Sequence, residues 1–255
     1  MYITTLGTSH GDPTYNRFNS STLYESGDKM YMVDCGEPAD ALLVRIGKRA
    51  NNLDALFVTH AHRDHLNGIA GIIGTAAKYP NPNKHLHIYV PEAAVIEGLR
   101  AWVMCMHGKD PTKSEQFTFH VIEPGFFYDD GHLRVKAIPT QHLCWASGGQ
   151  QFPSYAFQME MEGKKVLHTG DLKGDFSDFP AEAQTERFDI CLCEATHYDP
   201  VSATPVFMSA KLDRLLFVHI HNPWHGPMGE AALQKYCQNL PFPVAIAHDG
   251  DRVQI

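Results

Sequence analysis

Residues 59–65 read Thr-His-Ala-His-Arg-Asp-His, which places three histidines and one aspartate within a single short run. Neutral imidazoles and carboxylates are the side chains that bind borderline divalent metals. Residues two apart in an extended segment point the same way, so we expect His60 and His62 to hold one ion together. Asp64 and His65 follow where the chain turns into a helix, and we expect them to face a second ion. The run therefore indicates a metal centre rather than a solvated polar loop.

The composition bounds the class of protein. The chain has 255 residues, of which 44% are hydrophobic and 20% are charged, and this suits one large domain spanning 1–255. No apolar run approaches the roughly 20 residues that a membrane span needs. The first residues lack the basic and apolar stretches of a secretory signal, so we expect a cytoplasmic protein without a membrane partner.

The net charge indicates which binding partners to expect, and the spacing of the cysteines indicates their redox state. A net charge of −8 argues against a nucleic-acid polymer, because phosphate backbones are bound by basic patches. It allows a small anionic substrate, since two divalent cations would dominate the local field. Six cysteines, at positions 35, 105, 144, 191, 193 and 237, show no C-x-x-C spacing. We interpret all six as reduced core thiols, and we expect Cys191 and Cys193, which share one strand face, to pack in the core rather than to bind metal.

Hydrophobic periodicity predicts strands and helices in alternation. We expect strands near 2–8, 20–26, 29–34, 56–59, 85–90, 117–122, 133–138, 154–161, 164–168, 188–193, 215–220 and 243–247. We expect helices near 38–46, 66–77, 91–106, 201–212 and 228–238. The pattern repeats in two weak halves, roughly 1–125 and 126–255. Two facing β-sheets with helices outside would accommodate this α/β (α+β) order.

Four further polar residues each follow an apolar strand run: His142, Asp171, His197 and His219. Each alone would be a weak signal, because a histidine after a strand is commonly a surface or core residue. The strands of one sheet deliver their ends to a common edge, however, where functional residues gather. The four residues are therefore candidates to complete a site of two metals.

The chain resembles the metallo-β-lactamase superfamily, whose signature is T-H-x-H-x-D-H. The signature matches Thr59, His60, His62, Asp64 and His65, and the later ligands of the superfamily match His142, Asp171 and His219. The resemblance covers nearly the whole chain and implies a four-layer αββα sandwich. It also implies the ligand roles. Metal one would be held by His60, His62 and His142, metal two by Asp64, His65 and His219, and both by Asp171.

Within the superfamily the chain is most similar to the branch of ribonuclease Z and the cyclic-phosphate phosphodiesterases. Cys193-Glu-Ala-Thr-His is similar to the Glu-Ala-Thr element of ribonuclease Z. The stretch from His142 to Asp171 is too short for the tRNA-binding arm of that enzyme, which argues against structured RNA as substrate. Asp171 and His65 stand where β-lactamases carry a cysteine and no histidine after the aspartate, which argues against antibiotic hydrolysis.

These features predict a dinuclear metal-dependent hydrolase, foremost a phosphodiesterase that acts on a small or cyclic phosphodiester through a metal-bridging hydroxide. Two divalent ions are expected, zinc first, with manganese or iron as alternatives. Asp64 would orient the nucleophile, and His197, oriented by Glu194, is the candidate proton donor. Hydrolysis of a thioester or sulfate ester on the same fold, a non-enzymatic metal or ligand sensor, and a homodimer stay open.

Other histidines invite weaker interpretations. We expect His168 to hydrogen-bond behind the site and His10 to occupy a turn. His248-Asp249 is expected to support the second nitrogen of a ligand histidine. His221 and His225 lie in a loop that could line the pocket.

Overall fold

Two seven-stranded β-sheets face each other in the computed structural model, which describes residues 1–12, 14–143 and 151–255. The first sheet consists, in spatial order, of β14 (Asp251–Gln254), β1 (Tyr2–Gly7), β2 (Ser21–Ser26), β3 (Lys29–Val33), β4 (Ala55–Phe57), β5 (Leu86–Val90) and β6 (Phe117–Val121). The second consists of β13 (Val244–Ile246), β12 (Leu215–Ile220), β11 (Ile190–Ala195), β10 (Lys164–His168), β9 (Tyr155–Met161), β8 (Leu133–Pro139) and β7 (Gly125–Asp129).

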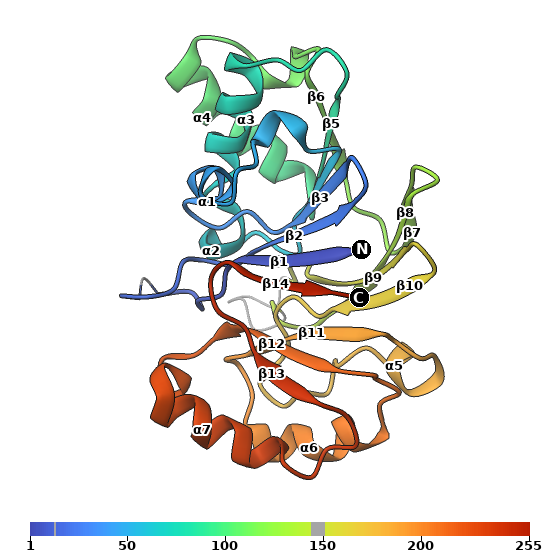
Figure 1. The fold of residues 1–255 in the computed structure, drawn as a ribbon. Coiled ribbons are helices and arrows are strands. Elements are labelled where there is room, and N and C mark those ends of the chain that lie inside the picture. Colours follow the sequence, from blue (N-terminus) through green and yellow to red (C-terminus); the bar gives the residue numbers. More distant parts are fainter. Residues whose placement is uncertain (13, 144–150) are drawn as a thin grey trace.

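The two sheets have nearly the same pattern of antiparallel and parallel strand pairs. Neighbouring strands are antiparallel from β14 to β3 in the first sheet and from β7 to β10 in the second. The remaining neighbours, β3 to β6 and β10 to β13, are parallel. The two predicted halves of the chain therefore correspond to the two sheets, with one exception. β14 leaves the second half and pairs with β1, so that both ends of the chain lie side by side (Figure 1).

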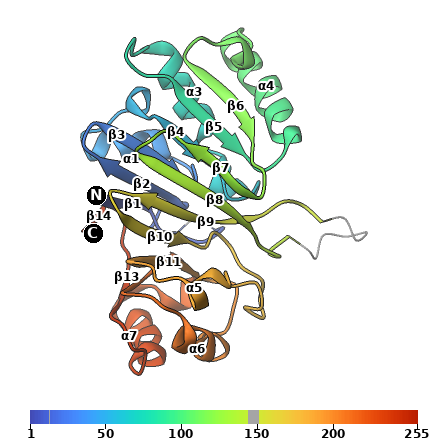
Figure 2. The ribbon, with the colours of Figure 1, turned by 90° about the vertical axis from the view of Figure 1, so that its right-hand side faces the viewer.

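Helices cover the outer face of each sheet. The helices are α1 (Ala39–Arg45), α2 (Arg63–Leu66), α3 (Ile69–Lys78), α4 (Ala93–His107), α5 (Glu182–Thr185), α6 (Pro200–Ser209) and α7 (Gly226–Cys237), with short 3-10 turns at Ala50–Asn52, Pro111–Lys113 and Asn222–Trp224. Apolar residues of α1, α3 and α4 pack on the first sheet, and those of α5, α6 and α7 pack on the second (Figure 2). The predicted αββα sandwich is confirmed. None of the helices in the described residues has the length and apolar character needed to cross a bilayer.

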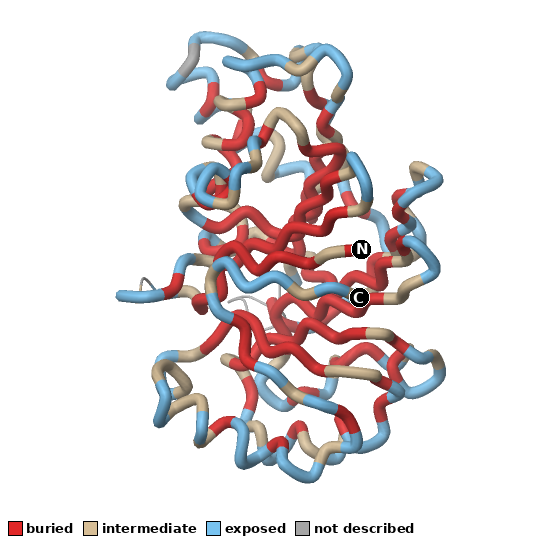
Figure 3. The backbone as a smooth tube through the Cα atoms, viewed as in Figure 1, coloured by how far each residue is buried: buried red, intermediate tan, exposed pale blue. Residues whose placement is uncertain are grey.

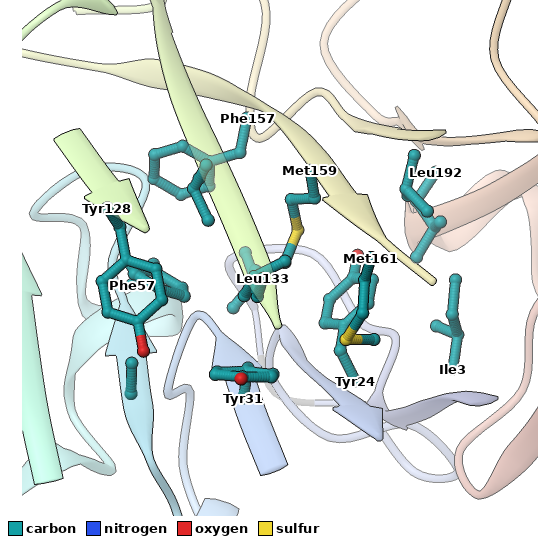
Figure 4. Close-up of a cluster of buried hydrophobic side chains, with 14 of the residues drawn as sticks. Ile3, Tyr24, Tyr31, Phe57, Tyr128, Leu133, Phe157, Met159, Met161 and Leu192 are labelled. Atoms are coloured by element: carbon teal, nitrogen blue, oxygen red, sulfur yellow. The ribbon is translucent and has the colours of Figure 1, made fainter. Parts of the chain in front are cut away.

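Alternation along the strands explains the layers. In β3, Tyr31 and Val33 belong to the cluster between the sheets, whereas Met30 and Met32 belong to the cluster beneath the helices, as the two-residue period of a strand requires. The cluster between the sheets joins side chains of both, including Phe157 of β9 (Figure 4). Most inner strands of both sheets are consequently buried along most of their length, whereas the edge strands β6, β7 and β14 are more exposed. The helices alternate between buried and exposed residues (Figure 3).

The predicted elements differ from the structure in several places. The short helix α5 was not predicted. The strands β7 and β14 were not predicted, because β7 is a short run after a Pro-Gly pair and β14 is a mostly exposed edge strand of mixed polarity. The helix expected over 66–77 begins only at Ile69, as α3, and a separate turn of helix, α2, precedes it. Gly68 lies between the two, where a Cβ would be 2.7 Å from the carbonyl oxygen of Gly36. The helix expected from Pro91 begins at Ala93.

The expectation of core cysteines holds for four of the five that the structure describes and is wrong for Cys105, which lies on an exposed position of α4. Cys35, Cys191, Cys193 and Cys237 are buried free thiols, and Cys105 is an exposed one. Cys144 lies outside the described residues.

The packing between the sheets predicts a large loss of stability on truncation of Phe57. This residue is fully buried in β4, and its ring centroid lies 5.0 Å from that of Tyr128 and 6.2 Å from that of Phe157, both on the facing sheet. We expect Phe57→Ala to lower the free energy of unfolding by about 3–5 kcal/mol, measured by urea denaturation. The control Met228→Ala, at a residue that is 88% exposed, should change it by less than about 0.5 kcal/mol. Equal effects of the two variants would contradict this account of the core.

Candidate metal centre

The segments that follow the strands bring the predicted ligands together at one edge of the two sheets. After β4, His60 forms a β-bridge with Ser154, His62 has extended backbone angles, and α2 then begins with the Arg63 turn that carries Asp64 and His65. The other three ligands follow or lie in strands of the second sheet: His142 after β8, Asp171 after β10 and His219 within β12. All seven predicted ligands belong to groups of side chains that could hold a metal ion.

The first group consists of His60, His62, His142 and Asp171. The Oδ2 atom of Asp171 lies 3.5 Å from the Nε2 of His60 and 3.6 Å from the Nε2 of His142. The Nε2 of His142 lies 3.3 Å from the Nδ1 of His62. Ligands placed about 2.0–2.1 Å from a tetrahedral zinc lie about 3.3 Å from one another. The donor atoms of this group are therefore spaced as ligands of one ion.

The second group consists of Asp64, His65, Asp171 and His219. The Oδ2 of Asp64 lies 3.0 Å from the Nε2 of His219 and 3.3 Å from the Nε2 of His65. The Oδ2 of Asp171 lies 3.4 Å from the same nitrogen of His65 and 3.6 Å from that of His219. Asp171 is thus common to both groups, which suits a carboxylate that is shared by two cations.

Three buried polar atoms test whether this donor set fits divalent metal. In the part of the chain that the structure describes, the Nε2 of His60, the Nε2 of His65 and the Oδ1 of Asp171 are buried and have no hydrogen-bond partner. Polar atoms left without a partner in the interior are costly, and native proteins avoid them. A cation at each group would satisfy the two histidine nitrogens and compensate the charge of the buried Asp171 carboxylate, so the residues present fit the metal that the fold implies.

Burial prepares the histidines to act as ligands. It lowers the pKa of His60, His62 and His142, so that these imidazoles favour the neutral form that binds metal. Burial alone would raise the pKa of Asp171, but the neighbouring histidines, His219 foremost, hold this pKa well below its usual range. The bridging position is therefore anionic, and the three histidines of the first group favour the neutral form beside it.

Asp34 supports the second group and was not predicted from the sequence. It follows β3, and its Oδ2 lies 2.7 Å from the Nδ1 of His65. Its Oδ1 accepts a hydrogen bond from the backbone amide of Thr59 at 2.7 Å. A carboxylate on the far nitrogen fixes the ring orientation of a metal-binding histidine and makes it more basic. The available signal was an aspartate directly after the strand that pairs with β4, but one such residue has no characteristic spacing.

Two further predicted ligands are oriented by neighbouring oxygen atoms. The Nδ1 of His142 lies 3.2 Å from the carbonyl oxygen of Leu172, and the Nδ1 of His219 lies 3.1 Å from the hydroxyl of Thr196. The Nε2 atoms of both rings are thereby directed toward Asp171. As expected, His168 lies behind the site, where its Nδ1 is 2.8 Å from the hydroxyl of buried Tyr24.

The expectation for His248-Asp249 is wrong. Asp249 accepts hydrogen bonds from the amides of Thr8 and Phe18, at 2.9 and 2.6 Å, and the Nε2 of His248 lies 2.8 Å from a carboxylate oxygen of Glu230. Neither residue is bonded to a ligand histidine. The reason is the return of β14 to β1, which places this turn against the N-terminal loop.

Glu194 connects the loops on the other side of the site. Its Oε1 accepts a hydrogen bond from the amide of Leu172 at 2.6 Å, and its Oε2 accepts from the amides of Thr196 and His197 at 3.0 and 2.9 Å. The same Oε2 lies 2.8 Å from the Nδ1 of His197, which is 3.8 Å from the Oδ2 of Asp171. Burial disfavours the imidazolium of His197, but Asp171 and Glu194 outweigh it and raise the pKa of His197 to about 9. The predicted pairing of Glu194 with His197 is present.

Backbone conformations that residues other than glycine rarely adopt occur at this edge. Asp34 and His219 have φ values of 59° and 50°, in the left-handed region. The pairing of β11 with β12 shifts its register between Glu194 and Ala195, opposite His219, and such a bulge re-aims a side chain. Strained conformations of this kind cluster at functional sites.

Comparisons with known proteins agree with this site and fold. Ribonuclease Z of Crocosphaera subtropica is 31% identical to the chain over 150 residues, which are 58% of this chain and 46% of that protein. Ribonuclease Z of Bacteroides thetaiotaomicron is 32% identical over 140 residues, 54% of this chain and 43% of that protein. The chain thus spans about half the length of the curated relatives it matches. These relatives are named as ribonucleases. They therefore do not support the expectation that a nucleic-acid polymer is excluded as a partner.

Solved structures show the same fold over the whole chain. The metallo-β-lactamase fold protein YhfI of Bacillus subtilis superposes with a TM-score of 0.77 at 21% identity, covering 99% of each chain. The short form of human tRNase Z superposes with a TM-score of 0.76 at 19% identity, covering 100% of this chain and 99% of that one. The predicted superfamily, near the ribonuclease Z branch, is confirmed.

A protein-family model narrows the assignment further. The model described as anti-Pycsar protein Apyc1 matches residues 1–203, which include the His60–His65 cluster, His142, Asp171 and His197. The chain therefore belongs to the anti-Pycsar protein Apyc1 family, within the metallo-β-lactamase superfamily.

Proposed function

We propose that the chain is a dinuclear metal-dependent phosphodiesterase that acts on a small or cyclic phosphodiester. The observation that carries this proposal is the position of the Oδ2 of Asp171. It belongs to both ligand groups and lies within 3.8 Å of ring nitrogens of five histidines: His60, His65, His142, His197 and His219. A carboxylate that two cations could share, with an imidazole donor beside it, suits two-metal hydrolysis.

The ligand roles follow the two groups. His60, His62 and His142 would hold one cation, Asp64, His65 and His219 the other, and Asp171 would bind both. Two bound cations would polarise the phosphoryl oxygens and lower the pKa of the attacking water toward neutrality. The Oδ2 of Asp64 faces His65 and His219, so its other carboxylate oxygen would orient the water for in-line attack.

His197 would supply the proton that the leaving oxygen needs. Its Nδ1 is held by Glu194, so the Nε2 of the ring is the nitrogen that would face substrate. Cations on Asp171 would offset the charge of that carboxylate, while buried Glu194 would continue to orient the ring and stabilise its protonated form. Glu194 therefore acts through His197 and through the three amides that it accepts from.

The acidic balance of the chain supports a small substrate. With a net charge of −8, the surface offers little attraction to a long phosphate backbone at physiological salt. Attraction for one phosphodiester would then come from the cations at the site.

Removal of the shared carboxylate should remove the metal. We expect Asp171→Ala to lose most of its bound metal and all measurable phosphodiester hydrolysis, because both groups lose their common ligand. Elemental analysis of protein purified without added metal, together with turnover assays, checks this. The control Asp175→Asn alters an exposed carboxylate four residues away and should retain both properties. An Asp171→Ala protein with the metal content of the unmodified chain would contradict the bridging role.

Removal of His197 should affect turnover without affecting metal. We expect His197→Ala to keep its metal and to lower kcat by about 10²–10⁴-fold, the range for a general acid or base. His132→Ala, at an exposed histidine in the turn before β8, serves as the matched control. Unchanged kcat in His197→Ala would exclude His197 as the proton donor.

Chelation and a substrate panel test the reaction class. Treatment with a chelator should abolish hydrolysis of bis-p-nitrophenyl phosphate and of cyclic nucleoside monophosphates, and added zinc or manganese should restore it. The panel also includes an acyl-thioester, an aryl sulfate ester and a tRNA precursor. Turnover of the thioester or sulfate ester alone would refute the phosphodiesterase proposal, and turnover of the tRNA precursor alone would refute the small substrate.

A further inference from the structure

A carboxylate outside both ligand groups, that of Asp178, joins the two loops that carry His142 and Asp171. Asp178 lies in the loop between β10 and α5, which also contains Asp171. Its Oδ2 accepts a hydrogen bond from the backbone amide of Gln141 at 2.6 Å, and its Oδ1 accepts one from the amide of Lys173 at 2.9 Å. Gln141 directly precedes His142 in the sequence. One side chain therefore ties the loop after β8 to the loop after β10.

The other hydrogen bonds between these loops are longer. The Nδ1 of His142 lies 3.2 Å from the carbonyl oxygen of Leu172. The hydroxyl of Thr140 donates to the carbonyl oxygen of Asp171 at 3.3 Å. Hydrogen bonds to a carboxylate are shorter and stronger than those between neutral groups. Among the described residues, Asp178 thus provides the shortest hydrogen bond between the two loops.

Packing beneath the loop holds Asp178 in place. Phe176 is buried, and its ring centroid lies 5.0 Å from that of Phe179 and 4.2 Å from that of Tyr198. The amide of Phe176 donates to the carbonyl oxygen of Lys173 at 2.8 Å. All three aromatic rings belong to the cluster between the second sheet and its helices. The turn that carries Asp178 is therefore anchored in the core, so the carboxylate has a fixed support.

Loss of Asp178 would release His142 while the bridging carboxylate keeps a second support. The loop after β10 is also held by Glu194, whose Oε1 accepts from the amide of Leu172 at 2.6 Å. The loop after β8 contains no acidic residue in the sequence from 140 to 154. It therefore depends on Asp178 for a carboxylate support.

We propose that Asp178 is a positioning residue that sets the zinc affinity of the first ligand group by holding His142 against Asp171. This inference rests on the proposed function, because it requires two cation sites. The second group has a separate support, since the Oδ2 of Asp34 lies 2.7 Å from the Nδ1 of His65. Each group thus has its own outer carboxylate, and the two sites can be weakened one at a time.

Competition with a chelator measures zinc affinity without any substrate. The unmodified chain loaded with zinc should hold two equivalents. For Asp178→Ala we expect one equivalent to bind about 10–100-fold more weakly, the usual cost of losing an outer contact to a metal site, and the other to be unchanged. Asp178→Asn keeps one acceptor oxygen and should lie between the two.

Asp175→Ala is the matched control within the same loop. The Oδ1 of Asp175 accepts from the amide and the hydroxyl of Ser177, at 3.0 and 2.6 Å, and these contacts do not reach the loop after β8. The Asp175→Ala protein should therefore bind both zinc equivalents as the unmodified chain does.

Variants of the predicted ligands identify which equivalent is weakened. His62→Ala removes a ligand of the first group, and adding Asp178→Ala to it should leave the affinity of the remaining zinc unchanged. His219→Ala removes a ligand of the second group, and adding Asp178→Ala to it should weaken the remaining zinc by about 10–100-fold.

The outcomes separate the role of Asp178 from the proposed function. If the unmodified chain binds two zinc ions and Asp178→Ala weakens both alike, or neither, Asp178 does not position the first group, and the proposed function stands. If the unmodified chain binds fewer than two zinc ions, the proposed function fails, and the role of Asp178 fails with it. Should Asp178→Ala not fold, Asp178→Asn decides by the same criterion.

Discussion

The structure depends on one constraint, the burial of a carboxylate amid imidazoles. The Oδ2 of Asp171 is the point on which both ligand groups converge, and Asp171 is only 2% exposed. A buried carboxylate is tolerated only where partners surround it. Those partners come from separate strands, so the sheets must be held in fixed relative positions for the charge to be satisfied at all. The apolar cluster between the sheets supplies that rigidity.

The backbone near Asp171 shows what this convergence requires. Gly170 has a φ of 58°, and a Cβ there would lie 2.7 Å from the carbonyl oxygen of Tyr155, so glycine is the residue that fits. His219 adopts a left-handed conformation beside a bulge. Such conformations persist only where the surrounding structure over-determines them. Here Thr196, Glu194 and the buried strands β11 and β12 do so.

Much of this arrangement could be predicted because its signals are local. The spacing of His60, His62, Asp64 and His65 sets their directions, since an extended segment followed by a helical turn has fixed geometry. Asp171 and His219 could be found because each lies at the end of an apolar strand run. Asp34 also follows a strand, but no other predicted ligand lies close to it in the sequence. Its role depends on the pairing of β3 with β4, which hydrophobic periodicity does not reveal.

The elements that escaped prediction depend on contacts between distant segments. β14 has little apolar character of its own, and it is a strand because β1 offers a free edge at Tyr2 to Thr5. Asp249 lies in the turn before β14, and this explains why it bonds to Thr8 and not to a ligand. The ring centroid of His10 lies 5.2 Å from that of His221 only because the end of β1 joins the end of β12.

The pairing of β14 with β1 has a consequence for how the chain is made. Of the strands described, β14 is synthesised last and β1 first, yet the two are neighbours in one sheet. On the ribosome, the edge of β1 is therefore open while every other strand emerges, and an open edge invites pairing with another chain. The loop that follows β1, which carries His10, gains its anchor at Asp249 only after strands β1 to β13 have been synthesised. The nascent chain thus fixes this loop beside Asp64 late, after the cluster at residues 60–65 has been synthesised.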